Sequence, residues 1–148
     1  MLKIIAASFG LIFATIGYAY SQTQTTIEMF IFNVANYTDI NTTFKIDTHR
    51  QNGKYGGINT LVYGDYLGYG ENNIQTGAKL ATIWISSAQG DESFDIHLPD
   101  EIVTETLYFD LKINLPDNSK YSIDKKPCHF NGPDRTSADC NVFIRNKR

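Results

Sequence analysis

The sequence has only two cysteines and a formal net charge of only −3 across 148 residues. Two cysteines are too few for a multi-cysteine zinc site or a dense disulfide scaffold. The small negative charge argues against nucleic-acid binding, which normally needs a clustered basic face. Hydrophobic residues make up 42% and charged residues 20%, which excludes a disordered tail and a polytopic membrane protein. The length fits one domain, at roughly 100–200 residues per domain.

The sequence also lacks the short motifs that mark common catalytic and metal sites. There is no G-x-S-x-G nucleophile motif, no glycine-rich phosphate loop and no calcium loop of the D-x-[DN]-x-[DN]-G type. The histidines have no H-E-x-x-H or H-x-H spacing, and we interpret them as three unrelated surface residues: His49, His97 and His129. We therefore predict a protein that is not an enzyme and that needs no cofactor or metal.

Paired carboxylates keep two alternatives open. They occur at Asp91-Glu92 and Asp100-Glu101, and hard oxygen ligands of this kind suit calcium at a loop end. Glycosidases also use two carboxylates, about 5–10 Å apart, but they place them in a substrate cleft that a small sandwich has difficulty building. A small hydrolase with an unrecognised site is thus the less favoured alternative.

The first 21 residues have the pattern of a secretory signal peptide. Lys3 supplies a positive charge, residues 4–16 are mostly apolar, and small residues follow at Ala19 and Ser21. The apolar run is shorter than the about 20 residues that a membrane anchor needs. We expect cleavage after Ser21, and hence a secreted or periplasmic domain of residues 22–148 with no stable membrane anchor.

Apolar and polar residues alternate along much of this domain, which is the pattern of half-buried β-strands. The alternation is clearest from Leu107 to Leu115, where five apolar residues share one face and predict one long strand. Residues 27–34 and 80–85 are apolar on both faces, which is typical of central strands or of strands covered by a second layer. Shorter alternating stretches carry their apolar residues at Phe44 and Ile46, at Phe94, Ile96 and Leu98, and at Cys140, Val142 and Ile144.

Seven to nine strands joined by turns are typical of a β-sandwich or a small barrel. No stretch of residues 22–148 carries the 3.6-residue period of a long helix. We predict an all-β fold, a single antiparallel β-sandwich of the Ig-like or jelly-roll-like kind, with a small β-barrel as the alternative. Cys128 and Cys140 enclose a turn sequence at 132–134, and in an oxidising compartment such cysteines pair, so we predict a disulfide.

The unusual segment is rich in tyrosine and glycine. Seven glycines lie between Gly53 and Gly77, and after Gly64 we expect the chain to leave the sheet and form a loop. Tyrosine gives broad contact area at small entropic cost, and glycine permits loop conformations, so binding loops are rich in both. We predict that this region binds a partner, either a protein or a glycan, through Tyr55, Tyr63, Tyr66, Tyr69 and the nearby Trp84.

These observations favour a secreted, non-enzymatic binding module. One alternative is a small secreted enzyme inhibitor or immunity-type protein that inserts a loop into a partner enzyme. Another is a purely structural hairpin whose tyrosines cover the edge of the core. Two glycosylation sequons, at Asn36 and Asn41, matter only in a eukaryotic source.

Overall fold

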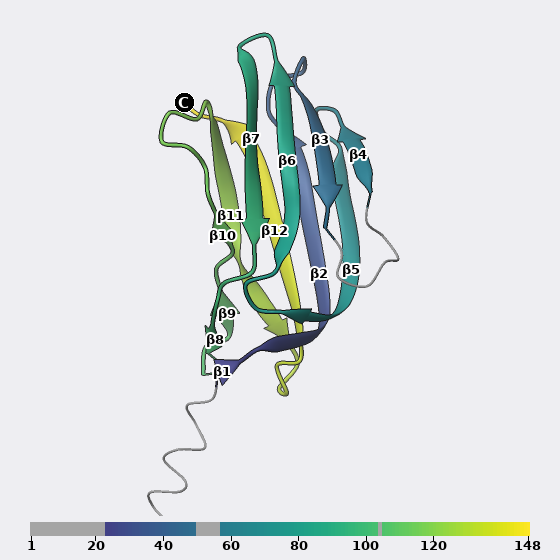
Figure 1. Ribbon diagram of the computed structural model, residues 1–148, viewed down its shortest axis with the longest axis vertical. Coiled ribbons are helices and arrows are strands. Elements are labelled where there is room, and N and C mark those ends of the chain that lie inside the picture. Colours follow the sequence, from purple (N-terminus) through teal and green to yellow (C-terminus); the bar gives the residue numbers. More distant parts are fainter. Residues whose placement is uncertain (1–22, 50–56, 104) are drawn as a thin grey trace, which may run out of the picture.

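The computed structural model describes residues 23–49, 57–103 and 105–148, and within them the regular structure is entirely β (Figure 1). The expected signal peptide therefore lies outside the described residues. None of the described residues forms a helix long and apolar enough to cross a membrane. The strands are β1 (Thr23–Gln24), β2 (Thr26–Tyr37), β3 (Thr43–Thr48), β4 (Ile58–Leu61), β5 (Tyr66–Gln75), β6 (Lys79–Ser87), β7 (Gly90–His97), β8 (Ile102–Val103), β9 (Tyr108–Phe109), β10 (Lys112–Ile113), β11 (Tyr121–Asn131) and β12 (Ser137–Asn146).

Two five-stranded sheets pack face to face, which confirms the predicted β-sandwich. Sheet I has the strand order β10-β7-β6-β3-β4, and sheet II has the order β5-β2-β12-β11-β9. Figure 1 shows sheet I in front of sheet II, with β1 and β8 as a separate small pair at one end. The paired strands are antiparallel except for β2 and β12, which run parallel along nine paired residues.

The core lies between the sheets and follows the predicted alternation. Strands β2 and β6 are both internal to their sheets, as the two apolar stretches predicted. Their outer faces are not covered by a further layer of the described chain, because Met29, Ile31 and Trp84 are exposed there. The inward side chains that are fully or almost fully buried include Phe30, Phe32, Val34, Phe44, Ile46, Ile83, Ile85, Ile96, Cys140, Val142 and Ile144.

The prediction of one long strand from Leu107 to Leu115 is wrong. Residues 108–109 form β9 at the edge of sheet II, and residues 112–113 form β10 at the edge of sheet I. Between them the chain crosses from one sheet to the other. Phe109 and Leu111 still point into the shared core and are buried, whereas Leu107 is exposed. Apolar and polar residues keep alternating across this crossing, because the inner faces of both sheets contact the same core. The alternation therefore does not reveal that the strand is broken.

A disulfide joins Cys128 in β11 to Cys140 in the neighbouring β12, as predicted. Both sulfur-bearing side chains are fully buried, and the two Cα atoms are 4.3 Å apart. The bond lies beside a register shift in the β11–β12 pairing, between residues 126 and 129. It therefore holds the two strands together where their regular pairing is interrupted.

Candidate functional site

The tyrosine-rich segment is mostly strand rather than loop. Gly64 has a φ of +86° and provides the predicted turn, but this turn leads from β4 in sheet I directly into β5 in sheet II. Tyr63 lies in the turn and Tyr66 begins β5, and both rings are exposed. The expected loop at Tyr66 and Tyr69 is thus wrong, because this part of the chain pairs with β2. Tyr55 lies outside the described residues.

Tyr69 belongs to the core, not to the surface. The residue is only 8% exposed, and its hydroxyl donates a hydrogen bond of 2.9 Å to the carbonyl oxygen of Leu80 in sheet I. Its ring packs edge-on against Phe32, with the ring centroids 5.5 Å apart. Strand parity explains this position, since residues 66 and 69 are an odd number apart and so point to opposite faces of β5.

Three aromatic side chains gather on the outer face of sheet II, and we name Tyr37, Tyr66 and Phe143 the tyrosine face. Ala35 in β2 is paired with Tyr66 on one side and with Phe143 on the other. The rings of Tyr37 and Phe143 are stacked with centroids 5.9 Å apart, and the Arg145 guanidinium lies 5.2 Å from the Tyr37 centroid. The small Ala35 thus leaves a depression of about 280 Å³ between the aromatic side chains.

Two asparagine side chains, Asn33 of β2 and Asn141 of β12, lie beside the tyrosine face on the same outer side of sheet II. The Asn33 amide donates a hydrogen bond of 3.1 Å to the side-chain oxygen of Asn141. Gly68 lies on the other side of Asn33, and only glycine fits there, because a Cβ atom would lie 2.5 Å from the Asn33 Oδ1. The glycine therefore lets the Asn33 side chain lie flat over β5. Next along β2, Ile31 is paired with Gly70 and is exposed.

Sequence reasoning found Tyr66 but missed Tyr37 and Phe143. The signal for Phe143 was present, because Val142 and Ile144 were assigned to the core and the residue between them must point outward. No comparable signal brought Tyr37 to Phe143, since their contact depends on the parallel pairing of β2 with β12.

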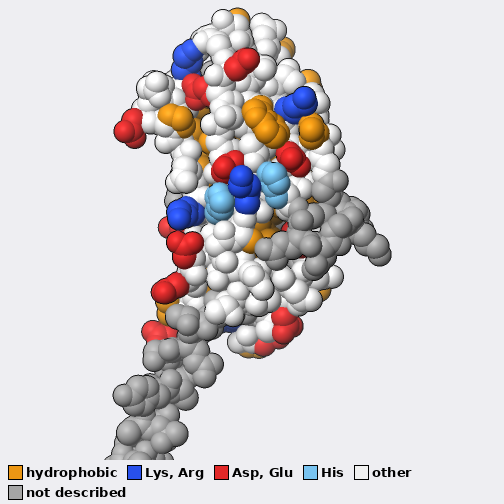
Figure 2. Space-filling model, viewed as in Figure 1, with side chains coloured by type: hydrophobic (Ala, Val, Ile, Leu, Met, Phe, Trp, Pro, Cys, Tyr) orange, Lys and Arg blue, Asp and Glu red, His pale blue; other side chains and the backbone are white. Residues whose placement is uncertain are grey.

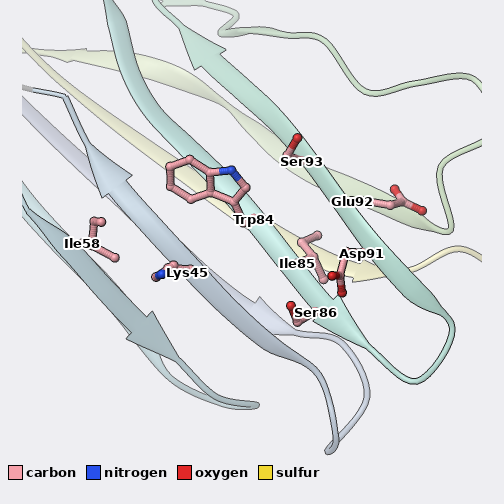
Figure 3. Close-up of a pocket in the computed structure, with 8 residues that line it drawn as sticks. All are labelled: Lys45, Ile58, Trp84, Ile85, Ser86, Asp91, Glu92 and Ser93. Atoms are coloured by element: carbon pink, nitrogen blue, oxygen red, sulfur yellow. The ribbon is translucent and has the colours of Figure 1, made fainter.

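Trp84 does not share a face with the tyrosines. It lies on the outer face of sheet I, on the opposite side of the sandwich. A shallow depression of about 450 Å³ surrounds it. Figure 3 shows the indole over β6, with Ile58 and Lys45 on one side and Ser93 on the other. We name the outward-facing residues of this depression the tryptophan face: Lys45, Ile58, Trp84, Ser86, Asp91 and Ser93.

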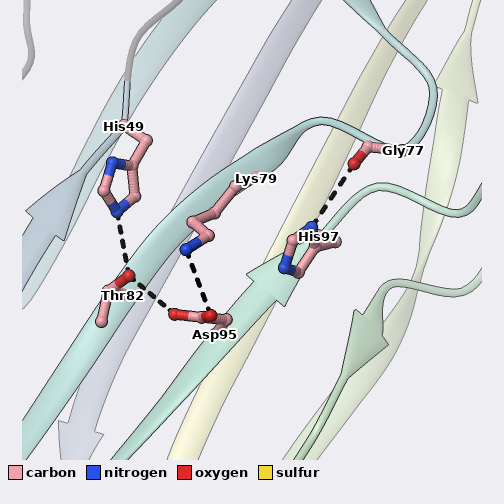
Figure 4. Close-up of polar contacts among 6 residues, drawn as sticks. All are labelled: His49, Gly77, Lys79, Thr82, Asp95 and His97. Carbon is pink, nitrogen blue, oxygen red and sulfur yellow. Dashed lines mark hydrogen bonds and ion pairs between the residues drawn. The ribbon is translucent and has the colours of Figure 1, made fainter.

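A polar network lies beside the tryptophan face (Figure 4). The Thr82 hydroxyl donates a 2.7 Å hydrogen bond to the Asp95 carboxylate and is itself 2.9 Å from the Nε2 of His49. Lys79 forms an ion pair with Asp95 at 3.2 Å. The Thr82 hydrogen bond, with help from Lys79 and His97, holds the pKa of Asp95 below its ordinary value. Because the Thr82 proton points to the carboxylate, this hydroxyl is not arranged as a nucleophile activated by His49.

The three histidines do not form one group. Figure 2, which views the outer face of sheet I, shows two histidines on either side of a basic side chain. His49 and His97 lie on this sheet, and the Nδ1 of His97 is 3.4 Å from the carbonyl oxygen of Gly77. His129 lies on β11 in sheet II, beside Asp139. In the described ranges no three His, Cys, Asp or Glu side chains are grouped so that they could hold a metal ion.

No family model and no curated protein matches the sequence. A search of solved structures finds similarity to the crystal structure of IP-1A from Alcaligenes faecalis. The alignment has a TM-score of 0.45 and 8% sequence identity, and it covers 84% of this chain and 94% of that one.

Proposed function

We propose that the protein is a secreted or periplasmic, non-catalytic binding module that holds a protein partner against the tyrosine face. The observation that carries the proposal is the contact of Tyr37 with Phe143 beside Tyr66, on an outer sheet face where none of the three is needed for the core. Tyr66 is 73% exposed. Large exposed apolar groups that gather in one place mark interaction sites more often than isolated ones do.

The chemistry of this face favours a protein as the partner. Tyrosine, phenylalanine, methionine and arginine are enriched where proteins meet, and Met29 and Arg145 lie at opposite ends of the same face. Asn33 and Asn141 supply amide donors and acceptors between the aromatic rings. Because the aromatic side chains lie on three neighbouring paired strands, β5, β2 and β12, their positions are fixed before binding, which lowers the entropic cost of association.

The disulfide supports the proposed compartment. Disulfides persist in oxidising compartments and are rare in the cytosol, and the Cys128–Cys140 bond is fully buried in the sandwich. Together with the signal pattern of residues 1–21, this supports export followed by cleavage near Ser21.

Affinity capture with residues 22–148, followed by measurement of the dissociation constant of each captured protein, tests the proposal. We expect Tyr66→Ala and Phe143→Ala each to raise that constant about 30-fold, which corresponds to about 2 kcal/mol, the usual threshold for an interface anchor. Tyr108→Ala is the matched control, because Tyr108 is an exposed tyrosine at the opposite edge of sheet II. Binding that is unchanged in both test variants would overturn the assignment of the tyrosine face.

A further inference from the structure

We propose a second binding site, on the tryptophan face, for a neutral glycan whose pyranose ring stacks on the indole of Trp84. The site lies on sheet I, whereas the tyrosine face lies on sheet II. The two sites are therefore independent, and one protein could hold a protein partner on one side and a glycan on the other.

The sheet register places polar side chains on both sides of the indole. Trp84 is paired with Lys45 of β3 on one side and with Ser93 of β7 on the other. Two residues further along β6, on the same face, Ser86 is paired with Asp91. Neighbouring strands are about 4.8 Å apart, so a ring lying on the indole would have polar side chains within reach at its edges.

These polar groups are not engaged by the rest of the described chain. No hydrogen bond or ion pair joins the side chains of Lys45, Asp91 or Ser93 to another described residue, whereas the nearby Asp95 is bound by both Thr82 and Lys79. The tryptophan face thus presents an ammonium, a carboxylate and a hydroxyl that are available to a ligand. Sugar hydroxyls both donate and accept hydrogen bonds and so can use all three.

The exposed apolar part of the site consists of the Trp84 indole and the Ile58 side chain. Trp84 is 38% exposed, and Ile58 beside it is exposed as well. Tryptophan presents the electron-rich face of its ring system to approaching C–H groups. The apolar face of a pyranose offers such C–H groups while its hydroxyls point outward. One indole with a single aliphatic side chain beside it, bordered by polar side chains, suits this ligand better than it suits the broad apolar contacts of a protein interface.

The charges at the site favour a neutral glycan. Among the described residues that line the depression, Lys45 is the only cation, and the acids Asp91 and Glu92 outnumber it. Glu92 already accepts hydrogen bonds from the Ser119 hydroxyl and the Lys120 backbone. A carboxylated or sulfated sugar would place a further negative charge beside these two acids, which is unfavourable.

Fluorescence titration tests the proposal directly, because Trp84 is the only tryptophan in the sequence. The protein, as residues 22–148, is titrated with neutral oligosaccharides of glucose, mannose and N-acetylglucosamine, and with oligogalacturonate as the anionic arm. We expect a saturable change in tryptophan emission with at least one neutral series and none with oligogalacturonate. The absence of saturable binding to any neutral series up to roughly 10 mM would overturn the proposal, as would binding to oligogalacturonate alone.

Variants then locate the site by calorimetry, which does not depend on tryptophan. We expect Trp84→Ala to weaken glycan binding at least tenfold, and Asp91→Ala and Lys45→Ala to weaken it several-fold. Asp91 and Lys45 are exposed surface residues, so their variants keep the test valid even if the tryptophan variant fails to fold. Tyr66→Ala is the matched control and should bind the glycan like the unaltered protein. Glycan binding that survives both Trp84→Ala and Asp91→Ala would place the site elsewhere, whatever the fate of the tyrosine face.

Discussion

The side-chain amide of Asn36 donates a hydrogen bond of 3.1 Å to the carbonyl oxygen of Leu61, and so connects the two sheets of the sandwich. Asn36 lies near the end of β2 in sheet II, and Leu61 ends β4 in sheet I. The same amide also reaches the carbonyl oxygen of Thr42, while the Asn36 side-chain oxygen accepts hydrogen bonds from the backbone and hydroxyl of Thr38. Asn36 is fully buried, so the sequon at this position is not accessible in the folded protein.

Replacing Asn36 with alanine should lower the free energy of unfolding by about 2–3 kcal/mol, because the buried carbonyl groups of Thr42 and Leu61, both on the side of sheet I, would lose this donor. Urea denaturation measures this change. Asn41→Ala is the control, since Asn41 is exposed, and it should change the stability by no more than about 0.5 kcal/mol. Equal effects of the two substitutions would contradict a connecting role for Asn36.

The two tyrosines of β5 should respond to substitution in opposite ways. Tyr69→Ala should destabilise the protein by about 3–5 kcal/mol, because it removes a large core side chain together with the hydrogen bond to Leu80. Tyr66→Ala should change the stability by no more than about 0.5 kcal/mol. Thermal or urea denaturation of the two variants measures these changes in stability. Similar decreases in the free energy of unfolding at both positions would mean that Tyr66 also packs against the core.

Reduction of the Cys128–Cys140 disulfide should lower the melting temperature without abolishing the sheets. The bond closes a short loop between positions separated by 12 residues, for which the chain-entropy account gives about 3 kcal/mol. Far-ultraviolet circular dichroism with and without reductant measures both effects. The double variant with alanine at both positions is the control, and its stability should be insensitive to reductant. Alkylation of two thiols in the unreduced native protein would contradict the pairing itself.

The sequence predicted the layers of the fold better than their connections. Phe44, Ile46 and Val142 could be assigned to the core because strand parity depends only on local sequence. The break between Phe109 and Leu111 could not be found in this way, since crossing from one sheet to the other leaves both side chains pointing into the same core.

The candidate site was predicted only in part, for a related reason. The aromatic composition of the segment pointed to Tyr66, but it also included Tyr69, whose position depends on the pairing of β5 with β2. The separation of Trp84 from the tyrosines arises because the turn at Gly64 changes sheets. Whether a strand joins one sheet or the other depends on tertiary packing, and neither the hydrophobic periodicity nor the turn residues specify it.

Asp95 offers a test of the polar network on sheet I through its pH dependence. The Thr82 hydroxyl is the largest cause of the lowered pKa of Asp95, ahead of the attraction of Lys79 and His97. A carboxyl group whose pKa is lower in the folded state than in the unfolded state stabilises the folded protein. For Asp95 this stabilisation is fully present at pH values above the ordinary pKa of 3.8. That stabilisation is lost as the pH falls through the lower folded-state pKa, where both states become protonated.

Thr82→Val should therefore raise the pKa of Asp95 back towards its ordinary value. The expected shift is measured by nuclear magnetic resonance of the Asp95 carboxyl carbon as a function of pH. Thr60→Val, a substitution at an exposed threonine of β4, is the control and should leave this pKa unchanged. The free energy of unfolding of Thr82→Val and that of the unaltered protein should become more similar as the pH falls below about 3.8. In the unaltered protein alone, protonation of Asp95 then removes a carboxylate that is hydrogen-bonded to Thr82. An unchanged pKa of Asp95 in Thr82→Val would show that Lys79 and His97 stabilise the charge without the Thr82 hydroxyl, and that this hydroxyl only bridges His49 and Asp95.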